Sequence, residues 1–140
     1  MQLEVFEVFE NFTKQDSRAA KIEYLRKMGN EIPAVKDVCL GAFSDKIEFA
    51  FPDGKPPYTP NKDQSVPSSL RRLHKQFGDF VAGSNRFKKL GQVRAEMRFI
   101  QMLESIHADH ALIVIDMINK KSPVKGLTKK IVEEAFPNLL

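Results

Sequence analysis

The chain has 140 residues, of which 42% are apolar and 29% charged, and this composition is typical of one globular domain with a buried core. Its single cysteine, Cys39, excludes an internal disulfide framework. The longest apolar run, Ala111 to Ile115, is too short for a membrane span, and the acidic N-terminal segment lacks the basic start of a secretory signal. We therefore expect an intracellular protein with no membrane partner.

Three helices are predicted in the first third of the chain. Residues 3–12 carry phenylalanines three apart, between glutamates, which indicates a buried aromatic stripe on one helix face. A second helix starts at Asp16 or Ser17 as N-cap and stops at Gly29. A third starts at Pro33, whose fixed φ suits a first helical turn, and buries Cys39.

The middle of the chain is predicted to be extended. Residues 46–51 alternate between apolar and polar or small side chains, which indicates an arm across the helices or a short edge strand. The proline-rich loop 52–67 that follows cannot be regular structure, because proline lacks an amide and fixes φ. We expect an ordered loop with Tyr58 folded onto the core; the alternative is that its prolines are a ligand for an aromatic groove.

The second half of the chain is predicted to be helical again. A helix capped by Ser68 or Ser69 precedes a basic connector at residues 86–89 and a central helix pair over residues 93–118. In that pair Met97, Ile100, Leu103 and Ile106 recur at helical spacing, and Phe99 and Met102 widen this stripe, so we expect the first helix to be buried on most sides. Asp109 is the expected N-cap of the second helix, and Thr128 caps a last short helix.

These elements predict a mainly α protein: a compact, single-domain helical bundle spanning residues 1–140, with five or six helices and one extended proline-rich excursion. No phosphate loop, dinucleotide fingerprint or nucleophile elbow is present. His107 and His110 are three residues apart, but one falls in a turn, so no metal site is predicted. We expect no cofactor and no enzymatic activity.

Basic residues are concentrated in one segment. Residues 71–98 hold eight basic and two acidic residues, a net charge of +6, while the rest of the chain, with fourteen basic and sixteen acidic residues, carries −2. Several of these bases lie at predicted helix starts, where the macrodipole favours acids, so helix stability does not explain them. Either they pair with acids elsewhere in the fold, such as those of residues 4–10, or they attract an anionic partner. The candidate site residues are Arg71, Arg72, Lys75, Arg86, Lys88, Lys89, Arg94, Arg98 and, in a loop near the C-terminus, Lys120, Lys121 and Lys125.

Three stretches resemble a known family. They are LGAFSDKIEFAFPDGKPPYTPN at residues 40–61, RFIQMLESIHADHALIVIDMINKK at residues 98–121 and KGLTKKIVEEAFPNLL at residues 125–140. They resemble small proteins of T4-like myoviruses that infect marine bacteria, and the resemblance extends over roughly residues 19 to 140. It implies a phage origin and a role in the host cytoplasm during infection, with the virion as the other location, but it transfers no catalytic residue.

Taken together, the basic segment and the resemblance predict a non-enzymatic, phage-encoded binding protein. The expected partner is nucleic acid, or the polymerase or replication machinery that works on it. The alternative is a structural or assembly protein of the virion, whose basic face binds an acidic protein surface. The sequence does not indicate an oligomeric state.

Overall fold

The structure is a computed structural model that describes residues 3–52, 54–61 and 69–140. These residues hold eight α-helices and one 3-10 helix, η1, with a single isolated β-bridge. Their bounds are α1 Val5–Thr13, α2 Arg18–Glu31, α3 Pro33–Phe43, α4 Leu70–Leu73, η1 His74–Phe80, α5 Asn85–Leu90, α6 Gln92–Ser105, α7 Ala108–Ile118 and α8 Lys129–Ala135. The mainly α prediction is confirmed. The predicted number of five or six helices is too low; one helix that was not predicted is α5, into which the basic connector folds.

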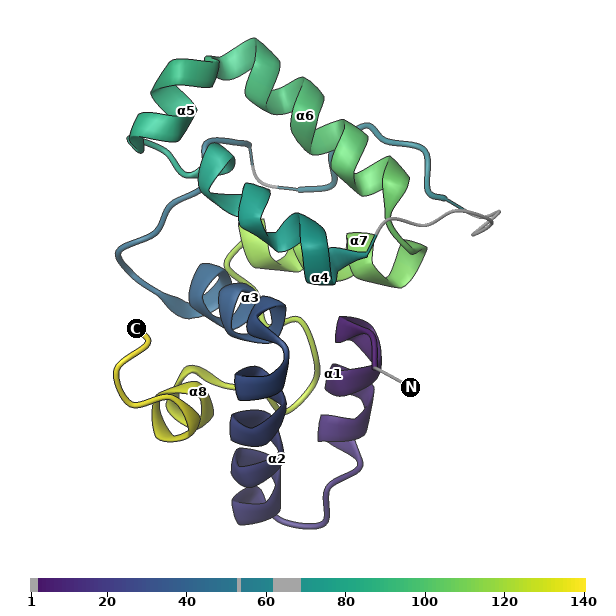
Figure 1. Cartoon of the computed structure of the whole chain (residues 1–140), viewed down its shortest axis with the longest axis vertical. Helices are drawn as coiled ribbons and strands as arrows, with labels where there is room; N and C mark the ends of the chain where they lie inside the picture. Colours follow the sequence, from purple (N-terminus) through teal and green to yellow (C-terminus); the bar gives the residue numbers. More distant parts are fainter. Residues whose placement is uncertain (1–2, 53, 62–68) are drawn as a thin grey trace.

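The helices are arranged around the pair formed by α3 and α7. Figure 1 places α1, α2 and α8 at one end of the molecule, α5 and α6 at the other, and α3 and α7 between them. In agreement with this view, α3 packs on α7, α2 on α8, and α6 on both α7 and η1. Buried apolar side chains from every helix except α5 form one continuous cluster. Within the described residues, none of the helices has the length and apolar character that crossing a membrane requires.

The first three helices follow their predicted starts but not all of their predicted ends. Ser17 accepts a hydrogen bond from the amide of Ala20 as N-cap of α2, and Pro33 opens α3, as predicted. Gly29, the predicted stop, lies inside α2 instead. It is buried where the Phe136 ring leaves no room for a Cβ, so this glycine serves helix packing rather than helix termination.

The extended middle segment lies across the helices as predicted. Phe49 forms the isolated antiparallel bridge with Val81, and Tyr58 packs against the core. The amide of Thr59 donates to the Glu104 carboxylate of α6 over 2.8 Å, and that of Gly54 donates to the Asn119 side chain over 2.9 Å. The proline-rich segment is thereby attached to α6 and to the end of α7. Residues 62–67 of the predicted loop, and Ser68 as a predicted cap, lie outside the described residues, whereas Ser69 caps α4.

Helix α6 buries only part of its predicted apolar stripe: Leu103 is buried as expected, whereas Met97 and Ile100 are not. Its buried residues are Ala95, Phe99, Met102 and Leu103, whereas Met97 is 57% exposed and Ile100 half-buried. The Phe99 ring stacks on Phe51 with 4.6 Å between centroids and meets Phe80 edge-on. Since aromatic rings bury the most apolar area, this contact fixes the rotation of α6 and turns Met97 toward solvent.

The start of α7 also differs from the prediction. His107 is the N-cap residue, and its Nδ1 accepts the amide hydrogen of Asp109 over 3.0 Å. Asp109 therefore lies in the first helical turn, where its negative charge is favourable beside the helix N-terminus.

Candidate anion-binding interface

The basic segment folds into consecutive elements that touch one another. Helix α4 adjoins η1, η1 packs on both α5 and α6, and α5 packs on α6. Ser84 caps α5 by accepting the amide hydrogen of Phe87, and Gly91, with φ of +86°, turns the chain directly into α6. Bases that are up to 27 residues apart in the sequence thus lie on adjoining helices.

One acid inside this segment holds two of the arginines. The Asp79 carboxylate, which is almost completely buried, accepts from Arg86 Nε over 2.9 Å and from Arg98 Nη1 over 3.0 Å. Arg86 also donates through Nη2 to the carbonyl of Lys75 over 2.8 Å. Its guanidinium lies against Gly78, where a Cβ would come within 2.6 Å of Nη1. Asp79 thus fixes both arginines in place and neutralises one of their two charges.

Five further bases have no such partner. Arg72, Lys75, Lys88, Lys89 and Arg94 are exposed, and none of their side chains forms an ion pair or hydrogen bond with the described part of the chain. Arg71 differs, because it is half-buried and donates to the carbonyl of Leu3 in front of α1. We call the surface of α4, η1, α5 and α6 that carries the five free bases together with Arg86 and Arg98 the basic face.

A hollow of about 470 Å³ opens at the edge of the basic face. Phe49 and Phe77 are among its apolar lining residues, and Lys75 and Arg86 lie on its wall. His74 also lines the hollow, and its Nδ1 donates to the Asp37 carboxylate of α3. A carboxylate can only accept, so this bond places the proton on Nδ1. The residues that line the hollow include no hydroxyl or thiol group that could act as a nucleophile.

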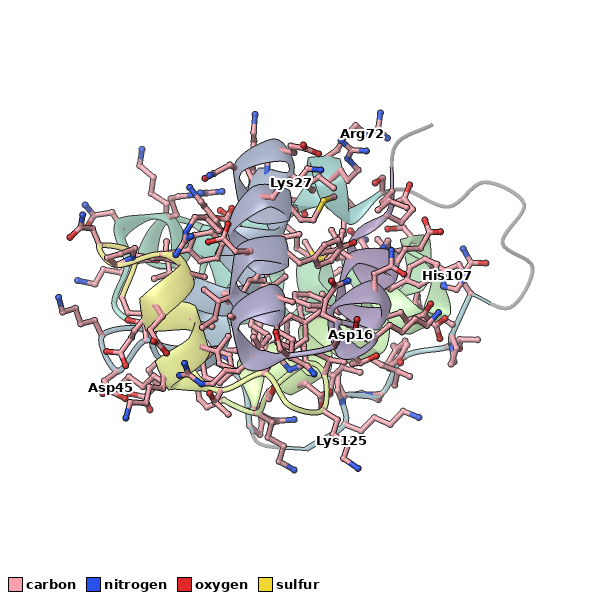
Figure 2. All side chains as sticks on the ribbon, turned by 90° about the horizontal axis from the view of Figure 1, so that it is seen from below. Asp16, Lys27, Asp45, Arg72, His107 and Lys125 are labelled. Carbon is pink, nitrogen blue, oxygen red and sulfur yellow. The ribbon has the colours of Figure 1, made fainter. Side chains whose placement is uncertain are left out.

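The lysine loop after α7 is not part of the basic face. Lys120 has a φ of +58°, and its ammonium donates to the carbonyls of Gly41, Ser44 and Ile47 over 2.5, 2.8 and 3.0 Å. The three carbonyls lie at the end of α3 and just beyond it. Burial lowers the pKa of the Lys120 ammonium. Lys125 projects from the opposite edge of the molecule to Arg72 in Figure 2, and Lys121 is exposed in the same loop. The loop was therefore wrongly grouped with the basic segment.

The histidines near α7 pack with an aromatic ring. His107 stacks on Phe6 with 4.6 Å between ring centroids, and His110 meets the same ring edge-on. His110 is 1% exposed, and neither of its ring nitrogens has a hydrogen-bond partner within the described residues. Burial lowers the pKa of His110 to about 4. The described residues contain no group of three His, Cys, Asp or Glu side chains that could hold a metal ion.

The sequence matches the profile of a family of unknown function, DUF6433, over residues 8–123. The chain belongs to this family. The match extends from α1 to the loop after α7 and so includes the whole basic face. No curated protein and no solved structure matches the chain.

Sequence patterns missed three features of this region. The Asp79 clamp joins residues 7 and 19 positions apart, and the His74–Asp37 pair joins residues 37 positions apart. Each of these pairs joins two different helices, so no pattern within one helix reports them. The sole clue was that Asp79 and Glu96 are the only acids in a segment of eight bases. The third feature is the exposure of Met97, which apolar periodicity had assigned to the core.

Proposed function

We propose that this chain is a non-enzymatic binding protein of a T4-like bacteriophage that binds the phosphate backbone of nucleic acid through the basic face. The phage origin rests on the resemblance of residues 40–61, 98–121 and 125–140 to proteins of such viruses. The observation that carries the binding proposal is a group of five exposed bases on consecutive, touching helices, none of which pairs with another of the described residues.

The geometry supports backbone contact rather than base reading. Lysine and arginine bind phosphates through charge and carry no sequence information when they do so. Of the phenylalanines in this region, Phe77, Phe80 and Phe99 are buried, and only Phe87 of α5, which is half-buried, could offer part of its ring to a single-stranded base. We therefore expect sequence-tolerant binding to duplex, in the host cytoplasm, at sites where replication or transcription proteins also act.

Asp79 fixes the positions of two arginines in the proposed site. Because Arg86 and Arg98 are held by this buried carboxylate, little side-chain entropy is lost when their remaining N–H groups meet a phosphate. A free lysine would lose more rotamer freedom on binding. The two arginines are thus preorganised, and the free bases around them supply the excess positive charge.

A charge-reversal experiment tests the proposal. The variant Arg72→Glu, Lys88→Glu, Lys89→Glu, Arg94→Glu should abolish binding to a short duplex at ~50 mM salt, where phosphate contacts are strong. It should still fold, because exposed bases without partners contribute less than about 0.5 kcal/mol each to stability. Fluorescence anisotropy gives the affinity and circular dichroism the fold.

The matched control reverses four other exposed lysines, Lys46, Lys121, Lys125 and Lys130, which lie outside the basic face. It changes the net charge by the same amount and should retain most of the binding. Equal loss in both variants would mean that net charge alone drives the association. Absence of binding by the wild type at the lower salt would remove nucleic acid as the partner and leave an acidic protein surface.

A further inference from the structure

The hollow at the edge of the basic face has the size of a small-ligand site. Its volume is about 470 Å³, and its walls come from α3, from η1 with the start of α5, and from the extended segment around Phe49. Among the described residues that line it, the polar ones are Asp37, His74, Lys75 and Arg86, and the others are apolar. The hollow is therefore an apolar space with a few polar groups at fixed places, as ligand sites usually are.

His74 places a hydrogen-bond acceptor in this hollow. The residue is 7% exposed, its Nδ1 donates to the Asp37 carboxylate, and no described residue bonds its Nε2. Nε2 is not among the fully enclosed polar atoms that lack a partner, so it reaches the open space of the hollow. With the proton on Nδ1, the neutral ring keeps a lone pair on Nε2 and can accept an N–H group of a ligand.

Two cationic groups lie together on the wall formed by η1 and α5. Arg86 Nη2 donates to the carbonyl of Lys75 over 2.8 Å, which keeps the two residues adjacent, and the Lys75 ammonium has no partner among the described residues. Arg86 uses Nε and Nη2 within the fold, whereas Nη1, which lies against Gly78 of the same wall, forms no bond with the described residues. The acid of the lining, Asp37, is already bonded to His74. Two side chains of this wall can therefore donate to one phosphate.

We propose that the hollow takes one unpaired nucleotide of the nucleic acid that lies on the basic face. The base enters between the apolar walls and donates an N–H group to His74 Nε2, while Lys75 and Arg86 hold the phosphate. Phe49 and Phe77 are each 7% exposed, so the base inserts between elements of the fold and does not stack on a ring at the outer surface.

The hollow is continuous with the basic face, because Lys75 and Arg86 belong to both. The inference therefore rests on the proposed function and adds a preference to it. A duplex that carries an unpaired nucleotide should bind more tightly than a blunt duplex, since that nucleotide has no base pair to break before it enters the hollow. A free nucleotide has the same chemistry, so the experiment has to separate the two sources.

The test compares the binding of the full chain, labelled with ¹⁵N, to related short DNA probes. They are a blunt duplex, the same duplex with one unpaired adenine nucleotide at the 3′ or the 5′ end, and the same overhangs with an abasic residue in place of that nucleotide. We expect one of the two adenine overhangs to bind about tenfold more tightly than the blunt and abasic probes, and to shift the amide signals of residues 37–41 and 74–78. Equal affinities for all probes would overturn the proposal and leave the basic face intact.

Deoxyadenosine monophosphate separates the two sources of the nucleotide. It should shift the same amide signals with Kd of ~1 mM, more weakly than the overhang duplex, because it lacks the contacts with the rest of the basic face. Tighter binding of this free nucleotide than of the overhang duplex would identify the free nucleotide as the ligand of the hollow. Absence of binding by every duplex would contradict the basic face, and absence of shifts with the free nucleotide as well would overturn the hollow.

Two substitutions locate the unpaired nucleotide. Leu40→Trp should fill the hollow from α3 and abolish the preference for the overhang, with unchanged affinity for the blunt duplex, whereas Leu112→Trp is the matched control on an exposed position of α7 outside the hollow. His74→Asn keeps an N–H donor for Asp37 but loses the lone pair of Nε2, so it should lose the preference as well. Circular dichroism checks the fold of each variant. A preference for the overhang that survives in folded His74→Asn, or in folded Leu40→Trp, would contradict the hollow as the site of the nucleotide.

Discussion

His110 lies in surroundings that disfavour a positive charge on its ring. It is buried beside the Phe6 ring and near His107, and a carboxylate oxygen of Glu4 lies 3.9 Å from its Nε2. Burial is the main cause of its lowered pKa, and the charge of His107 adds to it. The folded chain therefore holds this imidazole neutral at neutral pH.

The free energy of unfolding should depend on pH through this residue. The folded pKa of about 4 lies below the ordinary 6.5, so the unfolded chain takes up the proton first as the pH falls. The free energy of unfolding is therefore highest, as far as this residue is concerned, above pH ~6.5. It falls progressively toward pH ~4, by at most about 3 kcal/mol. Urea unfolding of the wild type and of His110→Leu at both ends of this range measures the effect. A difference between the two proteins that does not change with pH would contradict the assignment.

Lys120 was predicted to bind an anionic partner because of its charge, but its contacts give it a structural role. Its ammonium donates to three carbonyls at and just after the end of α3, of which that of Ser44 also accepts from the amide of Ile47 over 3.4 Å. Lys120→Gln should therefore lower the free energy of unfolding by about 1–3 kcal/mol, the range for lost charge-assisted hydrogen bonds. Duplex affinity should change less than in Lys88→Gln. An unchanged denaturant midpoint would show that the three bonds contribute nothing.

At the scale of single elements, α6 contributes to the core through Leu103 and to the basic face through Arg94. Leu103→Ala should cost about 2–5 kcal/mol by leaving a cavity in the core, whereas Met97→Ala should stay within about 0.5 kcal/mol. Denaturant unfolding of the two variants gives the comparison directly. Equal costs would mean that the buried face of α6 has been misassigned.

The starts of helices could be predicted from the sequence more reliably than the rotation of α6. Helix starts were predictable at Ser17, Pro33 and Thr128, because capping and first-turn chemistry are local. The rotation of α6 was not, since both of its faces carry apolar residues and tertiary contact with Phe51 and Phe80 decides between them. Helix α5 was missed for a related reason: it buries no residue and so has no apolar stripe to detect.

At the scale of the whole molecule, only some of the bases that were grouped from the sequence lie together in space. The bases of residues 71–98 lie on touching helices, but the lysines after α7 do not join them. Of the two explanations for bases at helix starts, internal pairing accounts for Lys129, which bonds Asp45 over 2.7 Å, and for Arg98 through Asp79. The five free bases have no such explanation within the described residues, and they are the reason for the proposed nucleic-acid contact.

The salt dependence of duplex binding tests that contact most directly, because counterion release counts the phosphates that are neutralised. The affinity should be measured at several salt concentrations between ~50 and ~200 mM for the wild type and for single Lys88→Gln, Lys89→Gln and Arg94→Gln variants. We predict that the slope of log affinity against log salt becomes shallower by about 0.9 for each substitution. Slopes that equal that of the wild type would mean that these side chains touch no phosphate, and would contradict the basic face as the nucleic-acid site.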